Sequence, residues 1–201
     1  MAARIKPGQG FRPGPIAWLP TLQAKGCAAL APQHLHWRVL KAMPATLHLL
    51  LLDTSGSMRQ GGRLALAKGY ATQVLEQAAR AGEHAAVLCF GGRGVEVLVP
   101  PGPARRAAAV RVQQRGGGGG TPLVQALVVA ESLVAQHRRV RGAMGTASTV
   151  LWLLTDGRTL EQPPAPRGAG QVVIVDFDDL RRPVDRCADW ARRWGGEYRK
   201  A

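Results

Sequence analysis

Residues 47–57 read LHLLLLDTSGS, an apolar run that leads into Asp53, with Ser55 and Ser57 at the next alternate positions. A continuous apolar run of this length is typical of a parallel strand that is buried on both faces. Carboxylate and hydroxyl oxygens are hard ligands, which suit Mg²⁺ or Mn²⁺ and suit soft metals poorly. The stretch therefore predicts a central strand that runs directly into a site for a hard divalent cation.

The rest of the chain alternates between strand-like and helix-like patterns. Two later apolar runs, 149–155 and 171–177, have the same character as the first. The short runs 85–90 and 95–99 flank a glycine-rich turn, which predicts a hairpin and hence one antiparallel strand at the sheet edge. Helical spacing or helix-start signals mark the segments 64–81, 103–112, 122–137 and 183–194, and 197–199 is expected to be a last edge strand. We expect an α/β fold with a doubly wound, mostly parallel sheet, one antiparallel edge strand and helices on both faces.

The first 45 residues differ from this pattern. Residues 1–20 contain four prolines and three glycines, which predicts an extended or disordered tail. A short helix is expected at 21–32 and an edge strand at 37–40. Residues 1–45 are thus predicted to be a partly disordered N-terminal extension, and 46–201 a globular domain.

Composition limits the classes of partner and the compartment. The chain has 27 Lys and Arg against 13 Asp and Glu, a formal net charge of +14. This charge favours acidic partners, although a solvated basic surface explains it equally well. No apolar run approaches the ~20 residues that span a bilayer, and the N-terminus has no signal-peptide core. The three separated cysteines form no CxxC pair, which disfavours a zinc site or disulfides and fits a reducing cytoplasm.

Two further loops extend the candidate site. Thr121 follows a run of glycines at a predicted helix start, and Asp156 follows the strand 149–155. Each loop alone is weak evidence, because Ser and Thr are common helix caps and Asp-Gly is an ordinary turn. All three loops nevertheless lie at strand–helix junctions, where doubly wound sheets place their sites.

The three loops resemble the metal-ion-dependent adhesion site of von Willebrand factor A domains, over about residues 46–199. The resemblance implies that the metal-site residues are Asp53, Ser55, Ser57, Thr121 and Asp156. In that family the hydroxyls bind the metal, and the aspartates bind it directly or through water. Two carboxylates would neutralise a divalent ion, and octahedral Mg²⁺ would keep one position for water or an outside oxygen ligand. An Asp or Glu of a partner would suit that position, and a basic surround would favour its approach.

Several stretches are similar in particular to the C-terminal A domain of magnesium-chelatase D subunits. They include DTSGSM at 53–58, GGGTPL at 118–123 and LLTDGR at 153–158. Related subunits accompany the cobalt chelatases (cobaltochelatases) of cobalamin synthesis. D subunits usually carry an AAA+-like domain and an acidic linker before this domain, whereas here a non-acidic segment of about 45 residues precedes it. The resemblance therefore implies a free-standing A-domain protein that meets its ATPase partner in trans.

Other readings of the same residues are weaker. An aspartyl-phosphate phosphatase needs a second Asp as general acid where Ser55 stands. A P-loop needs Gly-Lys-Ser/Thr after its glycines, whereas Thr121 is followed by Pro122, so the glycines more simply let the backbone carry Thr121 to the metal.

His34, His36 and His48 have no Cys or acidic companion at metal-ligand spacing, which favours core or surface roles. Nucleic-acid binding is permitted by the charge, but no basic run is interleaved with aromatics.

The resulting hypothesis is a non-catalytic, Mg²⁺-binding subunit of a magnesium or cobalt chelatase. Its metal site would dock an acidic residue of an AAA+ ATPase chelatase subunit, for metal insertion into a tetrapyrrole. A large chelatase subunit is a further candidate partner. The chain has no ATPase motif and no bond-making residue, so we expect no catalysis by this chain alone. Two alternatives stay open: a general A-domain adaptor for another AAA+ motor, and a basic RNA-binding A-domain protein.

Overall fold

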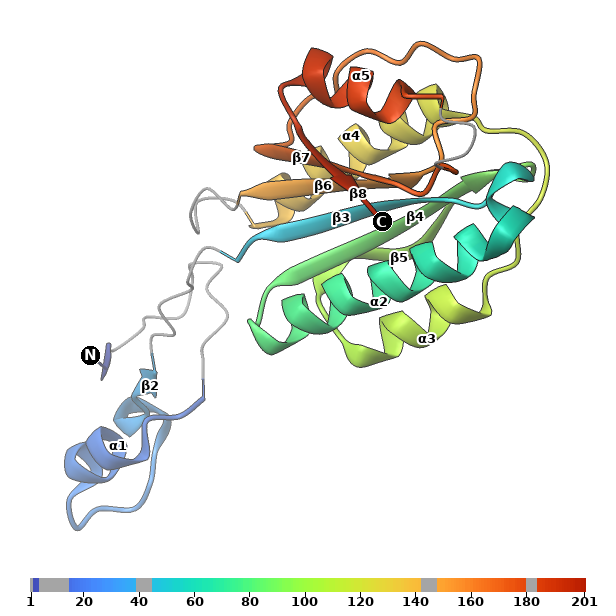
Figure 1. Ribbon diagram of the computed structural model, residues 1–201. Helices are drawn as coiled ribbons and strands as arrows, with labels where there is room; N and C mark the ends of the chain where they lie inside the picture. Colours follow the sequence, from blue (N-terminus) through green and yellow to red (C-terminus); the bar gives the residue numbers. More distant parts are fainter. Residues whose placement is uncertain (1, 4–14, 39–44, 142–147, 180–183) are drawn as a thin grey trace. The chain divides into compact units, whose positions relative to one another are not determined.

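The larger part of the chain is a layered α/β structure (Figure 1). The computed structural model describes residues 2–3, 15–38, 45–141, 148–179 and 184–201, and it divides into the compact units Met1–Met43 and Pro44–Ala201. In the larger unit the strands are Leu47–Asp53 (β3), His84–Gly91 (β4), Gly94–Pro103 (β5), Thr149–Thr155 (β6), Gln171–Asp176 (β7) and Glu197–Lys200 (β8). The helices are Arg63–Arg80 (α2), Arg106–Gln114 (α3), Leu123–Arg141 (α4) and Arg186–Trp194 (α5).

The sheet has the strand order β5-β4-β3-β6-β7-β8. Neighbouring strands pair in parallel, except for β4 and β5, which pair antiparallel at one edge. Figure 1 shows α2 and α3 on one face of the sheet and α4 and α5 on the other. The predicted fold class is therefore confirmed, including the antiparallel edge strand.

Alternate leucines of β3 pack into two separate cores. Leu47, Leu49 and Leu51 contribute to the core beneath α4 and α5. Leu50 and Leu52 contribute to the core beneath α2 and α3. Side chains alternate between the faces of a strand, so a strand covered on both sides must be apolar at nearly every position. This explains the continuous run from which the fold was predicted.

The β4–β5 hairpin is longer than expected. Gly91 pairs with Gly94 across the two-residue turn Gly92-Arg93, as the glycine-rich spacing predicted. β5 then continues through its prolines to Pro103, because an edge strand tolerates residues that cannot donate to the ladder. The expected helix start at Pro103 is therefore wrong, and α3 begins at Arg106.

A 3₁₀ helix, Ser57–Gly62 (η2), lies between β3 and α2 and was not anticipated. Gly61 and Gly62 have φ values of 60° and 76°, a left-handed conformation that glycine adopts without steric cost. These residues turn the chain from the candidate site into α2. α4 runs to Arg141, beyond the expected end near His137, and Pro183, the expected start of the last helix, lies outside the described residues.

The smaller unit contains a helix, Trp18–Lys25 (α1), and a 3₁₀ helix, Pro32–His34 (η1). The expected helix at 21–32 is shifted, because Pro20 fits the first turn of a helix, where a missing N–H costs nothing. The lack of regular structure expected within 1–20 is thus wrong for the start of α1, and residues 4–14 lie outside the described part. The expected edge strand at 37–40 is also different: Trp37–Arg38 (β2) pairs with Ala2–Ala3 (β1) in a two-stranded sheet, and residues 39–40 are outside the described part.

No helix within the described ranges has both the length and the apolar character of a bilayer span.

Candidate functional site

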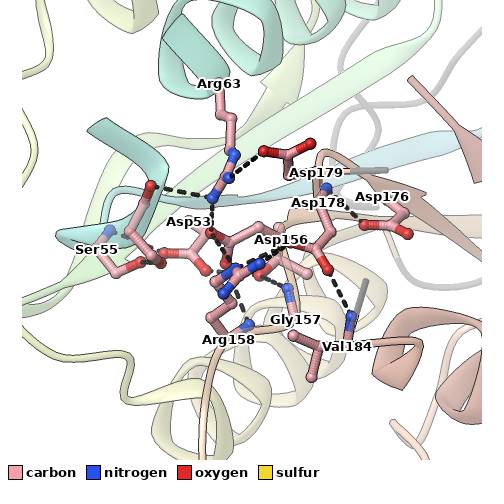
Figure 2. A network of polar contacts seen from close by, with 12 residues as sticks. Asp53, Ser55, Arg63, Asp156, Gly157, Arg158, Asp176, Asp178, Asp179 and Val184 are labelled. Carbon is pink, nitrogen blue, oxygen red and sulfur yellow. Dashed lines mark hydrogen bonds and ion pairs between the residues drawn. The ribbon is translucent and has the colours of Figure 1, made fainter. Parts of the chain in front are cut away.

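Four of the five predicted site residues lie together at the carboxyl ends of β3 and β6 (Figure 2 labels Asp53, Ser55 and Asp156). Asp53 is the last residue of β3, and Asp156 follows the last residue of β6. The strands are parallel neighbours, with Leu52 opposite Leu154, so the two loops leave the sheet side by side. Both carboxylates are buried, with exposed fractions of 0% and 1%.

The Asp53 carboxylate organises the first loop. Its Oδ1 accepts a hydrogen bond from the Ser55 backbone N–H at 2.8 Å. Its Oδ2 accepts one from the Thr155 hydroxyl at 2.6 Å. The Ser55 and Ser57 hydroxyl oxygens lie 3.2 Å apart and share a hydrogen bond. Three oxygen-bearing side chains of one loop are therefore held in a connected network.

Asp53 is a buried carboxylate with no ion-pair partner in the described part of the chain. Burial raises the pKa of Asp53 to about 6, and the hydrogen bonds from Ser55 and Thr155 only partly oppose this rise. The nearby charge of Asp156 raises the pKa further. Removing a carboxylate from water without a compensating cation is unfavourable. The position thus lacks a positive charge, which a divalent cation would supply.

Asp156 is surrounded differently, because two arginines contact it. Arg63 Nη1 lies 3.1 Å from Asp156 Oδ2, and Arg158 Nε lies 4.0 Å from the same oxygen. Arg63 also donates to the Ser57 carbonyl at 3.5 Å and lies 3.9 Å from Asp179 Oδ2. The sequence reading missed Arg63, whose only signal was its place at the start of the helix that follows the first loop.

Thr121 is the fifth predicted residue, and its loop is tied to the first loop by backbone contacts. Gly56 N–H donates to the Gly119 carbonyl at 2.9 Å, and Gly118 N–H donates to the Thr54 carbonyl at 2.6 Å. The Thr121 carbonyl accepts a bond from Thr159 Oγ1 at 3.4 Å. Within the described residues, no hydrogen bond joins the Thr121 hydroxyl to the other four side chains. Its place as a ligand stays a prediction.

A second group of carboxylates, not predicted from the sequence, lies at the end of β7 and directly after it, at the same edge (Figure 2). Asp176 Oδ2 accepts hydrogen bonds from Tyr198 Oη at 2.8 Å and from Lys200 Nζ at 3.0 Å. Asp178 accepts bonds from Arg158 at 2.9 Å and from the Val184 N–H at 2.7 Å. Burial alone would raise the pKa of Asp178, but these hydrogen bonds outweigh it, and the pKa is lowered. This group is internally neutralised.

The chemistry of the donors fits a hard cation. The described residues contain no cluster of three His, Cys, Asp or Glu side chains placed to hold a metal. A metal at Asp53 and Asp156 would therefore need hydroxyl or water oxygens as well. Ser55 and Ser57 supply such oxygens next to Asp53, and oxygen-only coordination is what Mg²⁺ and Mn²⁺ prefer.

His48 lies near the amino end of β3, away from this edge. His48 Nε2 lies 2.7 Å from Glu83 Oε2, and Trp152 Nε1 donates to His48 Nδ1 at 3.1 Å. The sequence reading missed Glu83 as an acidic companion because 35 residues separate the pair, and the adjacent strands β3 and β4 bring the two together.

Comparison with known proteins agrees with the fold. A family model described as von Willebrand factor type A domain matches residues 48–158, more than half of the chain. The magnesium-chelatase 60 kDa subunit of Cereibacter sphaeroides is 32% identical over 75% of this chain and 29% of its own length. The corresponding subunit of Rhodobacter capsulatus is 33% identical over 82% of this chain and 31% of its own length. The chain thus spans about a third of the length of these relatives.

Solved structures show the same fold at low identity. An aerotolerance-related membrane protein from Bacteroides fragilis superposes with a TM-score of 0.56 and 17% identity, covering 78% of this chain and 92% of that chain. Proximal thread matrix protein 1 of the mussel byssus superposes with a TM-score of 0.50 and 16% identity, covering 66% and 38%. At such identities the likeness shows the fold alone.

Proposed function

Because this chain belongs to the von Willebrand factor type A domain family, we propose that it binds Mg²⁺ at the carboxyl edge of its sheet and docks a partner protein through that metal. The observation that carries the proposal is Asp53, a fully buried carboxylate without an ion-pair partner in the described chain, which accepts hydrogen bonds from the Ser55 N–H and the Thr155 hydroxyl. A divalent cation supplies the missing charge, which is why the site favours a metal over an empty state.

The proposed ligands are Asp53, Ser55, Ser57, Thr121 and Asp156. Mg²⁺, or Mn²⁺ in its place, would offer an open coordination position to an oxygen of another molecule. Other groups of the chain orient the two carboxylates. Thr155 and the Ser55 N–H bind Asp53, and Arg63 binds Asp156. A carboxylate of a partner suits the open position because the chain is strongly basic.

The proposed partner is an AAA+ ATPase subunit of a chelatase that presents an acidic docking residue. Support comes from the relatives, whose names describe subunits of magnesium chelatase and which match this chain over most of its length. In this proposal the assembly, including a large chelatase subunit, inserts magnesium or cobalt into a tetrapyrrole, and this chain has an assembling role without chemistry of its own. An adaptor for another AAA+ motor would use the same ligands.

Calorimetric titration of Mg²⁺ tests the metal. Replacing Asp53 by Ala is expected to weaken Mg²⁺ binding by on the order of 100-fold or more, because the site loses a charged ligand. Asp178→Asn is the matched control, since Asp178 is an aspartate at the same edge that is already neutralised by Arg158. Equal Mg²⁺ affinity of the wild type and Asp53→Ala would refute the metal site.

A pull-down from the source cell, with either Mg²⁺ or EDTA, tests the partner. The expected result is capture of a chelatase-type AAA+ subunit by the wild type in Mg²⁺, and its loss in EDTA and in Asp53→Ala. Metal-dependent capture of a different AAA+ motor would contradict the chelatase hypothesis and support an adaptor for that motor.

A further inference from the structure

A hollow lies beside the loop that carries Asp53. Its volume is about 260 Å³, and it lies between the β4–β5 turn and the glycine run that precedes α4. The lining consists of Thr54, Arg93, Arg115 and seven glycines, namely Gly91, Gly92, Gly94, Gly116, Gly117, Gly118 and Gly119. The wall is therefore main chain and two cations, and no carboxylate among the described residues lines it.

The hollow exists because glycines, which have no side chain, line most of it. Gly92 N–H donates to the Gly118 carbonyl at 2.6 Å, which holds the hairpin turn against the glycine run. A Cβ atom on Gly92 would lie 2.4 Å from the Gly118 carbonyl oxygen, and one on Gly119 would lie 2.2 Å from the Gly92 Cα. Side chains at these positions would separate the two walls. The close backbone approach therefore depends on glycine at these positions, and it brings the turn that carries Arg93 next to the glycine run that follows Arg115.

The two arginines have unused hydrogen-bonding capacity. Arg115 Nη2 pairs with Glu96 Oε2 at 2.6 Å, but its Nε is buried and has no hydrogen-bond partner in the described part of the chain. Arg93 is exposed on the turn and has no ion pair with any described residue. A buried donor without a partner is costly, so Arg115 keeps a hydrogen-bonding position to fill, and Arg93 adds a cation that no described residue pairs with.

We propose that this hollow is a carboxylate subsite, which binds a second acidic side chain of the same protein segment that docks on the metal. The inference rests on the proposed function. Thr54 lines the hollow, while its neighbours Asp53 and Ser55 are proposed metal ligands, so a carboxylate here lies next to the metal site. Two acidic residues close together in one segment would engage both positions.

A carboxylate fits better than a phosphate group. Phosphate sites of glycine loops use the N-terminus of the helix that follows directly, usually with a lysine. Here Gly120, Thr121 and Pro122 separate the lining from the first residue of α4, and no lysine lines the hollow. The planar fork of a guanidinium can hold the two oxygens of a carboxylate, as it can those of a phosphate, so the missing lysine and the distance to α4 are what favour the carboxylate.

Titration of the ¹⁵N-labelled full chain in EDTA, followed by NMR, tests the subsite without metal or partner. Glutarate, a small dicarboxylate, is expected to shift the amide signals of the lining glycines. Replacing Arg93 or Arg115 by Gln should weaken glutarate binding about tenfold, the effect of losing one charge-assisted contact. Arg80→Gln, which removes the same charge at an exposed position at the end of α2, should leave it unchanged. Equal weakening by Arg80→Gln, or inorganic phosphate binding more than threefold tighter than glutarate, would overturn the assignment.

A fluorescently labelled hexaglutamate peptide then tests the two positions together. In Mg²⁺ the wild type is expected to bind this peptide about tenfold more tightly than Arg93→Gln, whereas Arg80→Gln binds like the wild type. Equal binding by the wild type and Arg93→Gln would refute the subsite and leave metal docking intact. Equal binding in Mg²⁺ and EDTA would instead count against the proposed function, while the glutarate result would stand.

Discussion

At the carboxyl edge of the sheet, the aspartate at the end of β3 and the aspartates at the end of β7 have different surroundings. Asp176 and Asp178 accept hydrogen bonds from Tyr198, Lys200 and Arg158, so their charges are met within the chain. Asp53, which is more deeply buried, is bonded only to neutral donors of Ser55 and Thr155. The charges of the β7 group are therefore balanced within the chain, whereas no cation of the described residues balances the charge of Asp53.

The largest expected effect lies in the neutralised group. Asp176→Asn should lower the free energy of unfolding by about 3 kcal/mol, because it weakens charge-assisted hydrogen bonds to Tyr198 and Lys200. Urea denaturation measures this change. Tyr198→Phe, which removes one of the two bonds, should cost about 1 kcal/mol. An unchanged midpoint for Asp176→Asn would contradict a structural role for the β7 group.

The backbone beside Asp53 should be nearly as sensitive. A Cβ atom on Gly91 would lie 2.6 Å from the Thr54 hydroxyl oxygen and 3.0 Å from its backbone carbon, so Gly91→Ala must displace the loop. We expect a loss of about 2 kcal/mol in unfolding free energy, with weaker Mg²⁺ binding. Gly102→Ala, in the same hairpin, meets no atom within 4 Å and should change neither quantity by a comparable amount.

Replacing Asp53 should have the opposite sign to replacing Asp176. In EDTA, Asp53→Asn is expected to raise the free energy of unfolding by about 1 kcal/mol, because it removes a buried charge that no cation compensates. Thermal unfolding with and without Mg²⁺ measures this effect, and the stabilisation by Mg²⁺ that we expect in the wild type should be absent from the variant. A metal-free Asp53→Asn protein less stable than the wild type would show that the carboxylate is already balanced.

The smallest expected effect concerns Arg63. Its guanidinium contacts Asp156 and competes with any cation for that carboxylate. Arg63→Gln should therefore tighten Mg²⁺ binding by about threefold in calorimetry, since a neighbouring positive charge is removed. The control Arg80→Gln changes the net charge equally, far along α2 from its start. Weaker Mg²⁺ binding in Arg63→Gln would mean that orienting Asp156 matters more than the competition.

The central strands were predictable because their burial on both faces leaves a direct record in the sequence. The apolar runs at 47–52, 149–155 and 171–177 correspond closely to β3, β6 and β7, and the carboxyl-edge position of Asp53 and Asp156 follows from their parallel pairing. Prolines were less decisive local signals, because a proline is compatible both with an edge strand and with the first turn of a helix. Pro103 continues an edge strand, and Pro20 lies within a helix.

The partners of the site residues were not predictable, because pairing of distant strands and helices creates them. Arg63 meets Asp156 across 93 residues, and Tyr198 meets Asp176 across 22, with no local spacing that signals either contact. Arg115 and Arg93 likewise come to one hollow only when the glycine run is bonded to the hairpin turn. The sequence shows which oxygen-bearing side chains stand at the strand ends. Which charges surround them depends on how the strands and helices pair in the fold.

The pairing of β3 with β6 also has a consequence for the order in which the chain folds. β3, α2, β4, β5 and α3 follow one another along the chain, and their contacts form between segments that are neighbours in sequence. Thr155, which holds Asp53, comes 102 residues later. Contacts of such separation form late, because the closing of a long loop must precede them. On a ribosome, Asp53, Ser55 and Ser57 would emerge long before Asp156, so the proposed cation site would be complete only after the strand β6 has been synthesised.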